Sequence, residues 1–290
     1  MIGRLRLTAA VLTGAALLAC APGRSATPSA DANNGYMLTF AEDFTDPAAT
    51  FPNARWTTDY ARWGGMRTLP DNGERQIYVD RTLTDDAGRP LGIDPFSIAD
   101  GTLAIAANPT PALSRPFLND LPYTSGLLTS THCQLYGYFE MRARMPKGQG
   151  LWPAFWLVGV GDHGNLEIDV VEVHGQRPQA VHQTVHDTQG KATHVYQGPD
   201  SSTGFHVYGL EWTPDRIVWS VDGVETFRRP NTIHVAMYML LNLAVGGNWP
   251  GYPDRTTLFP AQFLVDYVRA FHRRPHSADR ETRLMPTCPE

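Results

Sequence analysis

The sequence lacks an excess of basic residues. Its 290 residues include 24 lysines and arginines against 29 aspartates and glutamates, which gives a formal net charge of −5. Proteins that bind nucleic acids usually carry a basic patch that neutralises phosphates, so we expect no nucleic-acid partner. The sequence also lacks an apolar run of about 20 residues, the length that crosses a bilayer. It shows no long amphipathic helical pattern and no repeat at a fixed period, which argues against helical bundles and repeat architectures.

The N-terminal leader is short, basic and then apolar. The stretch Leu17–Cys20, "LLAC", ends this leader and resembles a bacterial lipobox. We therefore expect residues 1–20 to be a lipoprotein signal peptide, with Cys20 lipidated and the protein exported to the cell envelope. Ordinary cleavage after Ala21, which would leave the protein secreted, stays open. Contact with a membrane is expected only through this lipid anchor.

Cysteine is scarce, with three residues in the whole chain. Apart from Cys20, these are Cys133 and Cys288. In an oxidising compartment the two could form a disulfide that holds the C-terminal tail against the body of the protein. The alternative of two unrelated thiols stays open, because sequence does not give their separation.

The region from 36 to 273 is predicted to be one catalytic domain, between a flexible tether at 21–35 and a charged tail at 274–290. Its short runs alternate apolar and polar residues between turn signals, and the chain holds 26 glycines and 23 prolines. In "GYFEMRARM" one face carries only apolar residues, from Phe139 to Met145. "SVDGVE" has the Asp-Gly pair of a hairpin turn. These patterns predict an all-β fold of two packed antiparallel sheets.

The stretch "EIDVVE" carries three carboxylates at uneven spacing, Glu167, Asp169 and Glu172. Simple alternation puts the first two on one face of a strand and the third on the other. A β-bulge after Asp169 would return Glu172 to the same face. Two carboxylates with a third between them suit acetal hydrolysis. A solvated acidic strand and a site for calcium or another metal are the alternatives.

These acids follow "LWPAFWL", and together the two stretches resemble the signature of glycoside hydrolase family 16. Further similarity covers most of the chain, from "NGERQIYVD" to "FLVDYVRAF". The resemblance implies a β-jelly-roll sandwich with a concave substrate cleft. It also implies that Glu167 is the nucleophile, Glu172 the general acid/base and Asp169 an assisting acid. The six-residue "EIDVVE" is similar to the laminarinase-like branch of the family.

The resemblance further implies a retaining, endo-acting hydrolase of β-1,3- or mixed-linkage β-1,3-1,4-glucan that needs no cofactor for its chemistry. Alternatives within the family are hydrolases of agar, carrageenan or acidic exopolysaccharide, and transglycosylases. A non-catalytic carbohydrate-binding sandwich is the alternative from another class, although binding alone needs no pair of reacting acids. The expected partner is a polysaccharide, and we expect a monomer.

Aromatic residues are candidates for stacking against sugar rings. Trp249 lies in the predicted loop "GGNWPG" and Trp152 just before "PAFWL". Binding residues concentrate on loops, so we expect these two in the cleft. We expect Trp156, Trp212 and Trp219, which lie in strand-like runs, in the core.

Several polar residues are weaker candidates for the groove. By resemblance, His186 in "TVHD" is expected to contact sugar or nucleophile, whereas His174 and His182 are expected on the surface or in the core. Arg142 lies on the polar face of its strand and is predicted to reach a substrate hydroxyl. Asn72, Glu74 and Gln76 are predicted to line the far end of the groove, and the alternative that they are ordinary turn and edge residues stays open.

A structural calcium site is a further expectation from the resemblance. Glu42 in "FAEDF" and Asp266 in "LVDYV" match positions where relatives bind this ion on the convex side. Oxygen ligands from strand ends suit calcium. The alternative is that both are ordinary surface carboxylates.

Overall fold

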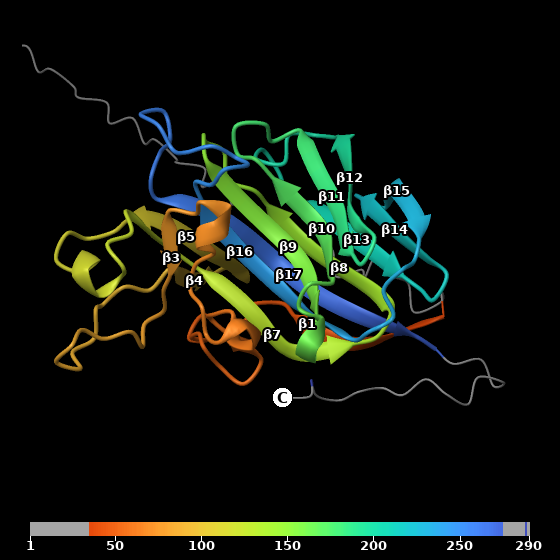
Figure 1. The fold of residues 1–290 in the computed structure, drawn as a ribbon, viewed down its shortest axis with the longest axis horizontal. Helices are drawn as coiled ribbons and strands as arrows, with labels where there is room; N and C mark the ends of the chain where they lie inside the picture. Colours follow the sequence, from red (N-terminus) through yellow and green to blue (C-terminus); the bar gives the residue numbers. More distant parts are fainter. Residues whose placement is uncertain (1–34, 275–287, 289–290) are drawn as a thin grey trace, which may run out of the picture.

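The computed structural model describes residues 35–274 and residue 288. Almost all of its regular structure is β-strand, in two stacked sheets, and this confirms the predicted all-β sandwich (Figure 1). The expectations for the signal peptide, Cys20 and nearly all of the tether and tail lie outside the described residues. In the described part no helix has the length and apolar character to cross a membrane. Its helices are three-residue 3₁₀ turns: η2 Ala61–Trp63, η3 Pro70–Asn72, η4 Arg115–Phe117 and η5 Gly161–His163.

The larger sheet has ten strands, which pair in the order β15-β14-β13-β8-β17-β5-β6-β3, with β1 added to β17 and β4 to β5. Its pairings are antiparallel except for β3 with β6. The strands are β1 Tyr36–Glu42, β3 Gln76–Tyr78, β4 Phe96–Ala99, β5 Thr102–Pro109, β6 Tyr123–Ser125, β8 Gly137–Arg144, β13 His206–Trp212, β14 Arg216–Val221, β15 Val224–Pro230 and β17 Ala261–Arg273.

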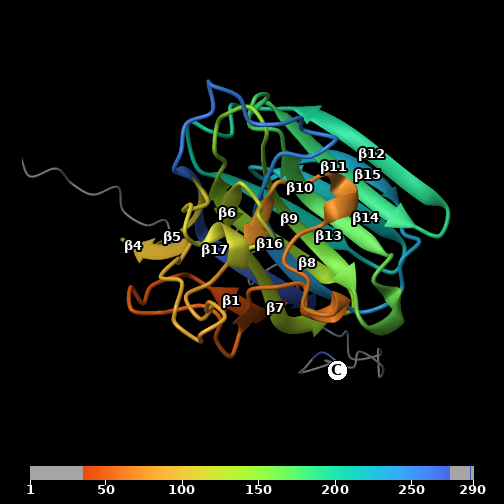
Figure 2. The same ribbon diagram turned by 60° about the vertical axis from the view of Figure 1, so that its left-hand side comes forward.

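The smaller sheet has seven antiparallel strands in the order β12-β11-β10-β9-β16-β7-β2. At one edge of the sandwich, its strand β12 lies next to β15 of the larger sheet (Figure 2). The strands are β2 Trp56–Thr57, β7 Leu127–Gln134, β9 Leu151–Gly159, β10 Glu167–Val173, β11 Ala180–Asp187, β12 Gly190–Gln197 and β16 Met237–Val245.

The hydrophobic core fills the space between the sheets. From β8 it takes Phe139, Met141 and Ala143, the apolar face expected from alternation, and all three are fully buried. The predicted hairpin is also confirmed, because β14 and β15 are joined at Asp222 and Gly223 with φ angles of 51° and 77°. Such left-handed angles at both central residues are typical of the tight turn that Asp-Gly favours.

The smaller sheet has a second, open face directed away from this core. On β9, Phe155 and Leu157 belong to the core, while Ala154 and Trp156, which alternate with them, lie on the open face. Loops that precede β3 cover part of the open face, and Tyr60 from one of them packs there in a separate aromatic cluster. The remaining surface forms a groove above the middle strands.

Strand β10 contains the predicted bulge. Against β11, Asp169 pairs with Thr184 and Glu172 pairs with His182, so three steps on β10 match two on β11. Against β9 the irregularity lies between Asp169 and Val171, which makes Val170 the extra residue. The bulge therefore restores the phase of the strand before Glu172.

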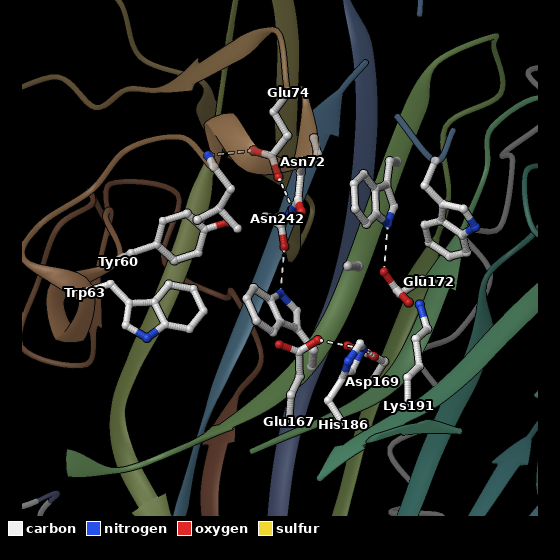
Figure 3. Close-up of a pocket in the computed structure, with 16 residues that line it drawn as sticks. Tyr60, Trp63, Asn72, Glu74, Glu167, Asp169, Glu172, His186, Lys191 and Asn242 are labelled. Atoms are coloured by element: carbon white, nitrogen blue, oxygen red, sulfur yellow. Dashed lines mark hydrogen bonds and ion pairs between the residues drawn. The ribbon is translucent and has the colours of Figure 1, made fainter. Parts of the chain in front are cut away.

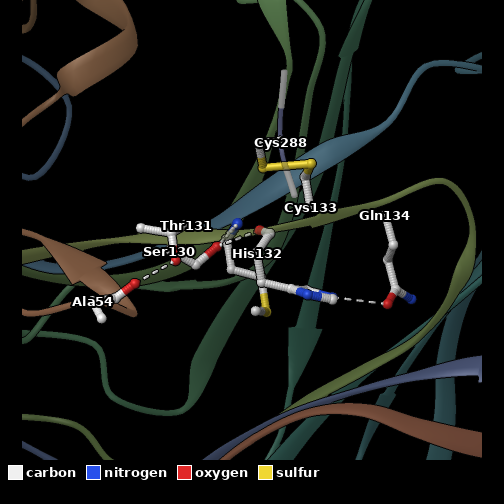
Figure 4. The surroundings of a disulfide bond; sticks show 8 residues. Ala54, Ser130, Thr131, His132, Cys133, Gln134 and Cys288 are labelled. Carbon is white, nitrogen blue, oxygen red and sulfur yellow. Dashed lines mark hydrogen bonds between the residues drawn. A yellow bond between two sulfur atoms is a disulfide. The ribbon is translucent and has the colours of Figure 1, made fainter. Parts of the chain in front are cut away.

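A disulfide joins Cys133 on β7 to Cys288, the first of the two alternatives that the sequence left open (Figure 4). Their Cα atoms are 5.2 Å apart, a usual separation for a disulfide. Cys133 is fully buried on the open face of the smaller sheet and packs beside Val158 and Tyr238. The bond therefore holds the end of the chain against the sheet that carries the groove.

We expect Cys288→Ser to lower the stability of the fold. The disulfide links positions 155 residues apart, and closing so long a loop restricts the unfolded chain, with a typical effect of about 2–5 kcal/mol. Thermal melts of the wild type with and without reductant, and of Cys288→Ser, would measure it. Reductant should lower the wild-type Tm to that of the variant and leave the variant unchanged; equal Tm values throughout would contradict the prediction.

Candidate active site

The three acids of β10 line one pocket on the open face of the smaller sheet (Figure 3). Glu167, Asp169 and Glu172 point into it together because of the bulge at Val170. The other lining residues come from the neighbouring strands and covering loops: Tyr60, Trp63, Leu69, Asn72, Glu74, Trp152, Ala154, Trp156, His186, Lys191, Asn242, Ala244 and Trp249.

Few hydrogen bonds compensate the charges of these acids. His186 on β11 places its Nε2 atom 3.5 Å from Glu167 Oε1 and 3.5 Å from Asp169 Oδ2. Asp169 Oδ2 is buried and has no hydrogen-bond partner. At the other end of the cluster, the indole N–H of Trp152 donates to Glu172 Oε1 at 2.9 Å. Glu167 and Asp169 therefore share one environment around the His186 ring, and Glu172 has a different one beside Trp152.

Burial raises the pKa of all three acids. For Glu167 the second cause is the charge of Asp169, and for Asp169 it is the charge of Glu172. Burial and then the Glu167 charge raise the pKa of Glu172 to about 8, although the Trp152 hydrogen bond and Lys191 oppose the shift. A carboxyl group with such a pKa holds its proton at neutral pH, as a general acid must.

One cation lies over this acidic cluster. Lys191 on β12 pairs with His186 across the strands, lines the pocket and lowers the pKa of each of the three acids. Its ammonium group lies 5.3 Å from the ring centre of Trp249, within the range of a cation–π contact.

An aromatic wall stands on the Glu167 side of the pocket. The Trp63 ring lies 5.1 Å from Tyr60 and 6.0 Å from Trp156 between ring centres. The indole N–H of Trp156 donates to Asn242 Oδ1 at 2.8 Å, and Asn242 donates in turn to Tyr78. Trp156 is buried, as expected, but its place is in the pocket and not in the core between the sheets. Trp212 and Trp219 are in that core.

The far end of the pocket is polar. Asn72 lies there as expected, and its amide donates to Glu74 Oε1 at 3.1 Å. Gln76 donates to the other oxygen of Glu74 and accepts from the Val245 N–H, so it holds the carboxylate in place. Burial raises the pKa of Glu74.

Arg142 does not reach the pocket, so its predicted contact with substrate is wrong. It lies on β8 in the larger sheet, where its guanidinium bonds Asp266 at 2.6 Å and lies 4.9 Å from the ring centre of Phe205. Alternation correctly assigns Arg142 to a polar face, but it does not tell which sheet that face belongs to.

The two carboxylates expected to hold calcium each have an arginine beside them. Asp266 is paired with Arg142, and Glu42 lies 3.5 Å from Arg55 and accepts from the Trp56 indole. These contacts do not favour a cation at either carboxylate, and the calcium site stays a prediction.

A cation could instead be held within the acidic cluster. Glu167, Asp169 and His186 have potential ligand atoms within 4.8 Å of one another, and no other such trio occurs among residues 35–274 and 288. Two carboxylates and an imidazole suit a transition metal better than calcium. The same atoms are those that would act directly in acid–base and nucleophilic chemistry.

Sequence reasoning missed four aromatic or polar residues of the pocket: Tyr60, Trp63, Asn242 and Lys191. Tyr60 and Trp63 lie at the short 3₁₀ turn η2, and both rings pack against Trp156, which is far away in the sequence. Lys191 stands on the second strand after the acids, where only its cross-strand pairing with His186 gives its position. Among them, only Asn242 has a sequence signal, because it is the one amide within the apolar run of β16.

We expect Glu172→Gln to stabilise the fold increasingly as pH rises. The pKa of Glu172 is about 8 in the folded protein and about 4.3 in an unfolded chain, so folding loses stability between these values as the unfolded chain ionises first. The variant avoids this loss. Its Tm should exceed that of the wild type by roughly 5 °C or more at pH 8 and much less at pH 4.

Glu225→Gln is a suitable control, because the pKa of Glu225 is lowered by Arg228 and the opposite trend is expected. A Tm difference for Glu172→Gln that does not change between the two pH values would contradict the assigned environment.

Comparison with known proteins places the chain in a family. Residues 84–269 match Glycosyl hydrolases family 16. The endo-1,3-1,4-beta-glycanase EglC of Rhizobium meliloti (strain 1021) is 41% identical over 80% of this chain and 51% of that protein. A beta-glucanase of Rhodothermus marinus is 34% identical over 62% of this chain and 71% of its own length. The laminarinase catalytic domain from Thermotoga maritima MSB8 superposes with a TM-score of 0.66 and 29% identity, over 81% of this chain and 98% of that one.

The chain spans about half the length of the first two curated relatives, 51% of one and 44% of the other. The matched segment nevertheless includes β10 with its three acids and most strands of both sheets. Family match, fold similarity and the acidic cluster agree with the resemblance noted in the sequence. The chain belongs to glycosyl hydrolase family 16.

Proposed function

We propose that the protein is a retaining, endo-acting hydrolase of β-1,3- or mixed-linkage β-1,3-1,4-glucan. The observation that carries the proposal is the arrangement of Glu167, Asp169 and Glu172 on one face of β10, with the pKa of Glu172 raised to about 8. Relatives named as an endo-1,3-1,4-beta-glycanase and a laminarinase support the choice of glucan. The pocket runs from Asn72 across the middle strands to Lys191, as suits an internal segment of a long chain.

The chemistry is a double displacement. The Glu167 carboxylate attacks the anomeric carbon while Glu172 donates its proton to the glycosidic oxygen, which leaves on the departing sugar. The Glu172 carboxylate then removes a proton from water, whose oxygen attacks the same carbon and releases Glu167. Two inversions retain the β-configuration. Asp169 and His186, which adjoin Glu167, hold its carboxylate in place.

The surrounding residues bind the glycan. Trp152 and Trp249 stack against sugar rings next to Glu172, and the wall of Tyr60, Trp63 and Trp156 serves the units on the Glu167 side. The chemistry itself uses no cofactor. We also propose that Cys20 is lipidated and that the enzyme acts on polysaccharide outside the cytoplasm.

Release of reducing ends from a panel of polysaccharides tests the proposal. Laminarin and mixed-linkage β-glucan should be cleaved with an early fall in viscosity, whereas agar and carrageenan should not. The assays should be run with a chelator present. Cleavage of agar or carrageenan alone would replace the substrate assignment, and turnover that requires an added metal would contradict the cofactor-free chemistry.

Substitution of the two reacting acids should have different effects. Glu167→Gln keeps the shape but cannot form the glycosyl ester, so turnover should fall by about 10³-fold or more. Glu172→Ala should retain turnover on aryl glycosides with good leaving groups, and azide should restore its rate through a β-glycosyl azide. Rescue at Glu167 with an α-azide product would mean that the roles are exchanged.

Proton NMR of fresh digests should show the β-anomer first.

Lys191 should set the alkaline limit of activity. Because the general acid works in its protonated form, kcat/KM should fall as pH rises through about 8, the pKa of Glu172. Lys191 lowers this pKa, so Lys191→Met should move the alkaline limb to higher pH. Lys191→Arg keeps the charge and serves as the matched control. A limb that stays in place in Lys191→Met would contradict the assignment of Glu172 as the acid.

A further inference from the structure

Two β-bulges in opposite sheets are joined across the core. One is the bulge of β10 that aligns the three acids. The other is in the larger sheet, where Trp219 of β14 pairs with Phe227 of β15, and Ser220 pairs with Glu225. One step on β14 therefore matches two on β15, with Thr226 as the extra residue.

The first contact between the bulges is made by the indole of Trp219. This side chain is fully buried, and its N–H donates to the main-chain carbonyl oxygen of Asp169 at 2.8 Å. In a regular ladder, a strand carbonyl points to a neighbouring strand of its own sheet. The carbonyl of Asp169 meets a side chain from the other sheet, so the bulge turns this peptide group towards the core. The indole ring is stacked on Phe227, with 4.9 Å between ring centres.

The second contact joins Thr226 to β11, the strand beside β10. Gln183 is the residue of β11 opposite the bulge, because its two neighbours in the chain pair with Asp169 and Glu172. Gln183 is fully buried, and its side-chain amide donates to the Thr226 hydroxyl at 2.7 Å. The extra residue of the larger sheet is therefore bonded to the strand that faces the bulge of the smaller sheet.

We call these two contacts, Trp219 with the Asp169 carbonyl and Thr226 with Gln183, the bulge clamp. The Trp219 contact lies among the apolar side chains of the core. A buried carbonyl that loses its donor is costly, so without the indole this peptide group favours turning back to a strand partner. The strand would then regain regular alternation, which turns Glu172 away from the groove.

We propose that Trp219 is a positioning residue for catalysis, which acts through the bulge clamp to hold Glu172 in line with Glu167. Glu167 lies before the bulge and Glu172 after it, so loss of the clamp misplaces the acid/base more than the nucleophile. Trp219 lies in the core and does not line the active-site pocket. The inference rests on the proposed glycan-hydrolase function and adds to it a residue that acts without touching substrate.

Trp219→Phe tests the inference, because phenylalanine keeps an aromatic ring but has no N–H. We expect kcat on laminarin to fall roughly 10- to 100-fold, since a small misplacement of a reacting group is enough for such a loss. KM should stay within about twofold of the wild type, because the groove residues are unchanged. On aryl β-glycosides with good leaving groups, azide should raise the turnover of this variant, as expected for Glu172→Ala.

Trp212→Phe is the matched control. Trp212 is also a fully buried core tryptophan of the larger sheet, but its indole N–H donates to the Ile233 carbonyl at 3.2 Å and not to β10. Both variants lose a buried indole hydrogen bond, so thermal melts should show similar losses in Tm. Only Trp219→Phe should lose kcat and respond to azide.

Equal kcat values for the two variants, or a Trp219→Phe enzyme that azide does not accelerate, would overturn the inference. If Trp219→Phe does not give folded protein, Thr226→Val decides, because it removes the other contact of the clamp with little change in volume. Wild-type kcat in Thr226→Val would then overturn the inference, and a lower kcat that azide restores on aryl glycosides would support it.

The proposed function is tested separately. Hydrolysis of laminarin by the wild type and the azide response of Glu172→Ala do not depend on Trp219. An enzyme that passes both tests while Trp219→Phe behaves like Trp212→Phe keeps the function and loses the role assigned to Trp219.

Discussion

The structure depends on one extra residue in one strand. Val170 and Val171 are both buried in the core, so two successive side chains of β10 face inward before Glu172 returns to the open face. Burying each valine contributes about 2 kcal/mol, and the sheet pairings on both sides of β10 fix the register. Apolar burial therefore holds three acids together that would repel one another in a free chain. The acids in turn determine where the proposed glycan substrate would lie.

The same constraint places acids with different neighbours side by side, as the two roles proposed for Glu167 and Glu172 require. The acids are buried alike, but Glu172 accepts a bond from Trp152, whereas Glu167 and Asp169 share the His186 ring. Burial and mutual repulsion raise the pKa of all three acids, whereas His186 lowers that of Glu167, and Trp152 and Lys191 lower that of Glu172. The cluster therefore holds protons at neutral pH, and the proposed proton donor and the proposed nucleophile lie on a single strand.

Sequence was sufficient wherever the information was local to a strand. Alternation and the spacing of "EIDVVE" predicted the sandwich, the bulge and the common face of the acids, and all three are confirmed. It failed where a position depends on which strands become neighbours. Arg142 has the pattern of a groove residue but lies in the other sheet, and Lys191 reaches the acids only through pairing of β11 with β12. Trp156 and Tyr60 meet because a loop folds over the sheet, which no periodicity records.

The bulge has a consequence for how this strand can drift in evolution. Loss of the codon for Val170 would leave the acids at even two-residue steps, and a regular strand presents such positions on one face. The gain of a codon there would make the second step four residues, which a regular strand also presents on one face, but it would move the last acid two residues farther along the strand, about 7 Å from the other two. A strand shortened by one residue therefore keeps the three acids close together, whereas a strand lengthened by one residue separates the last acid from the other two.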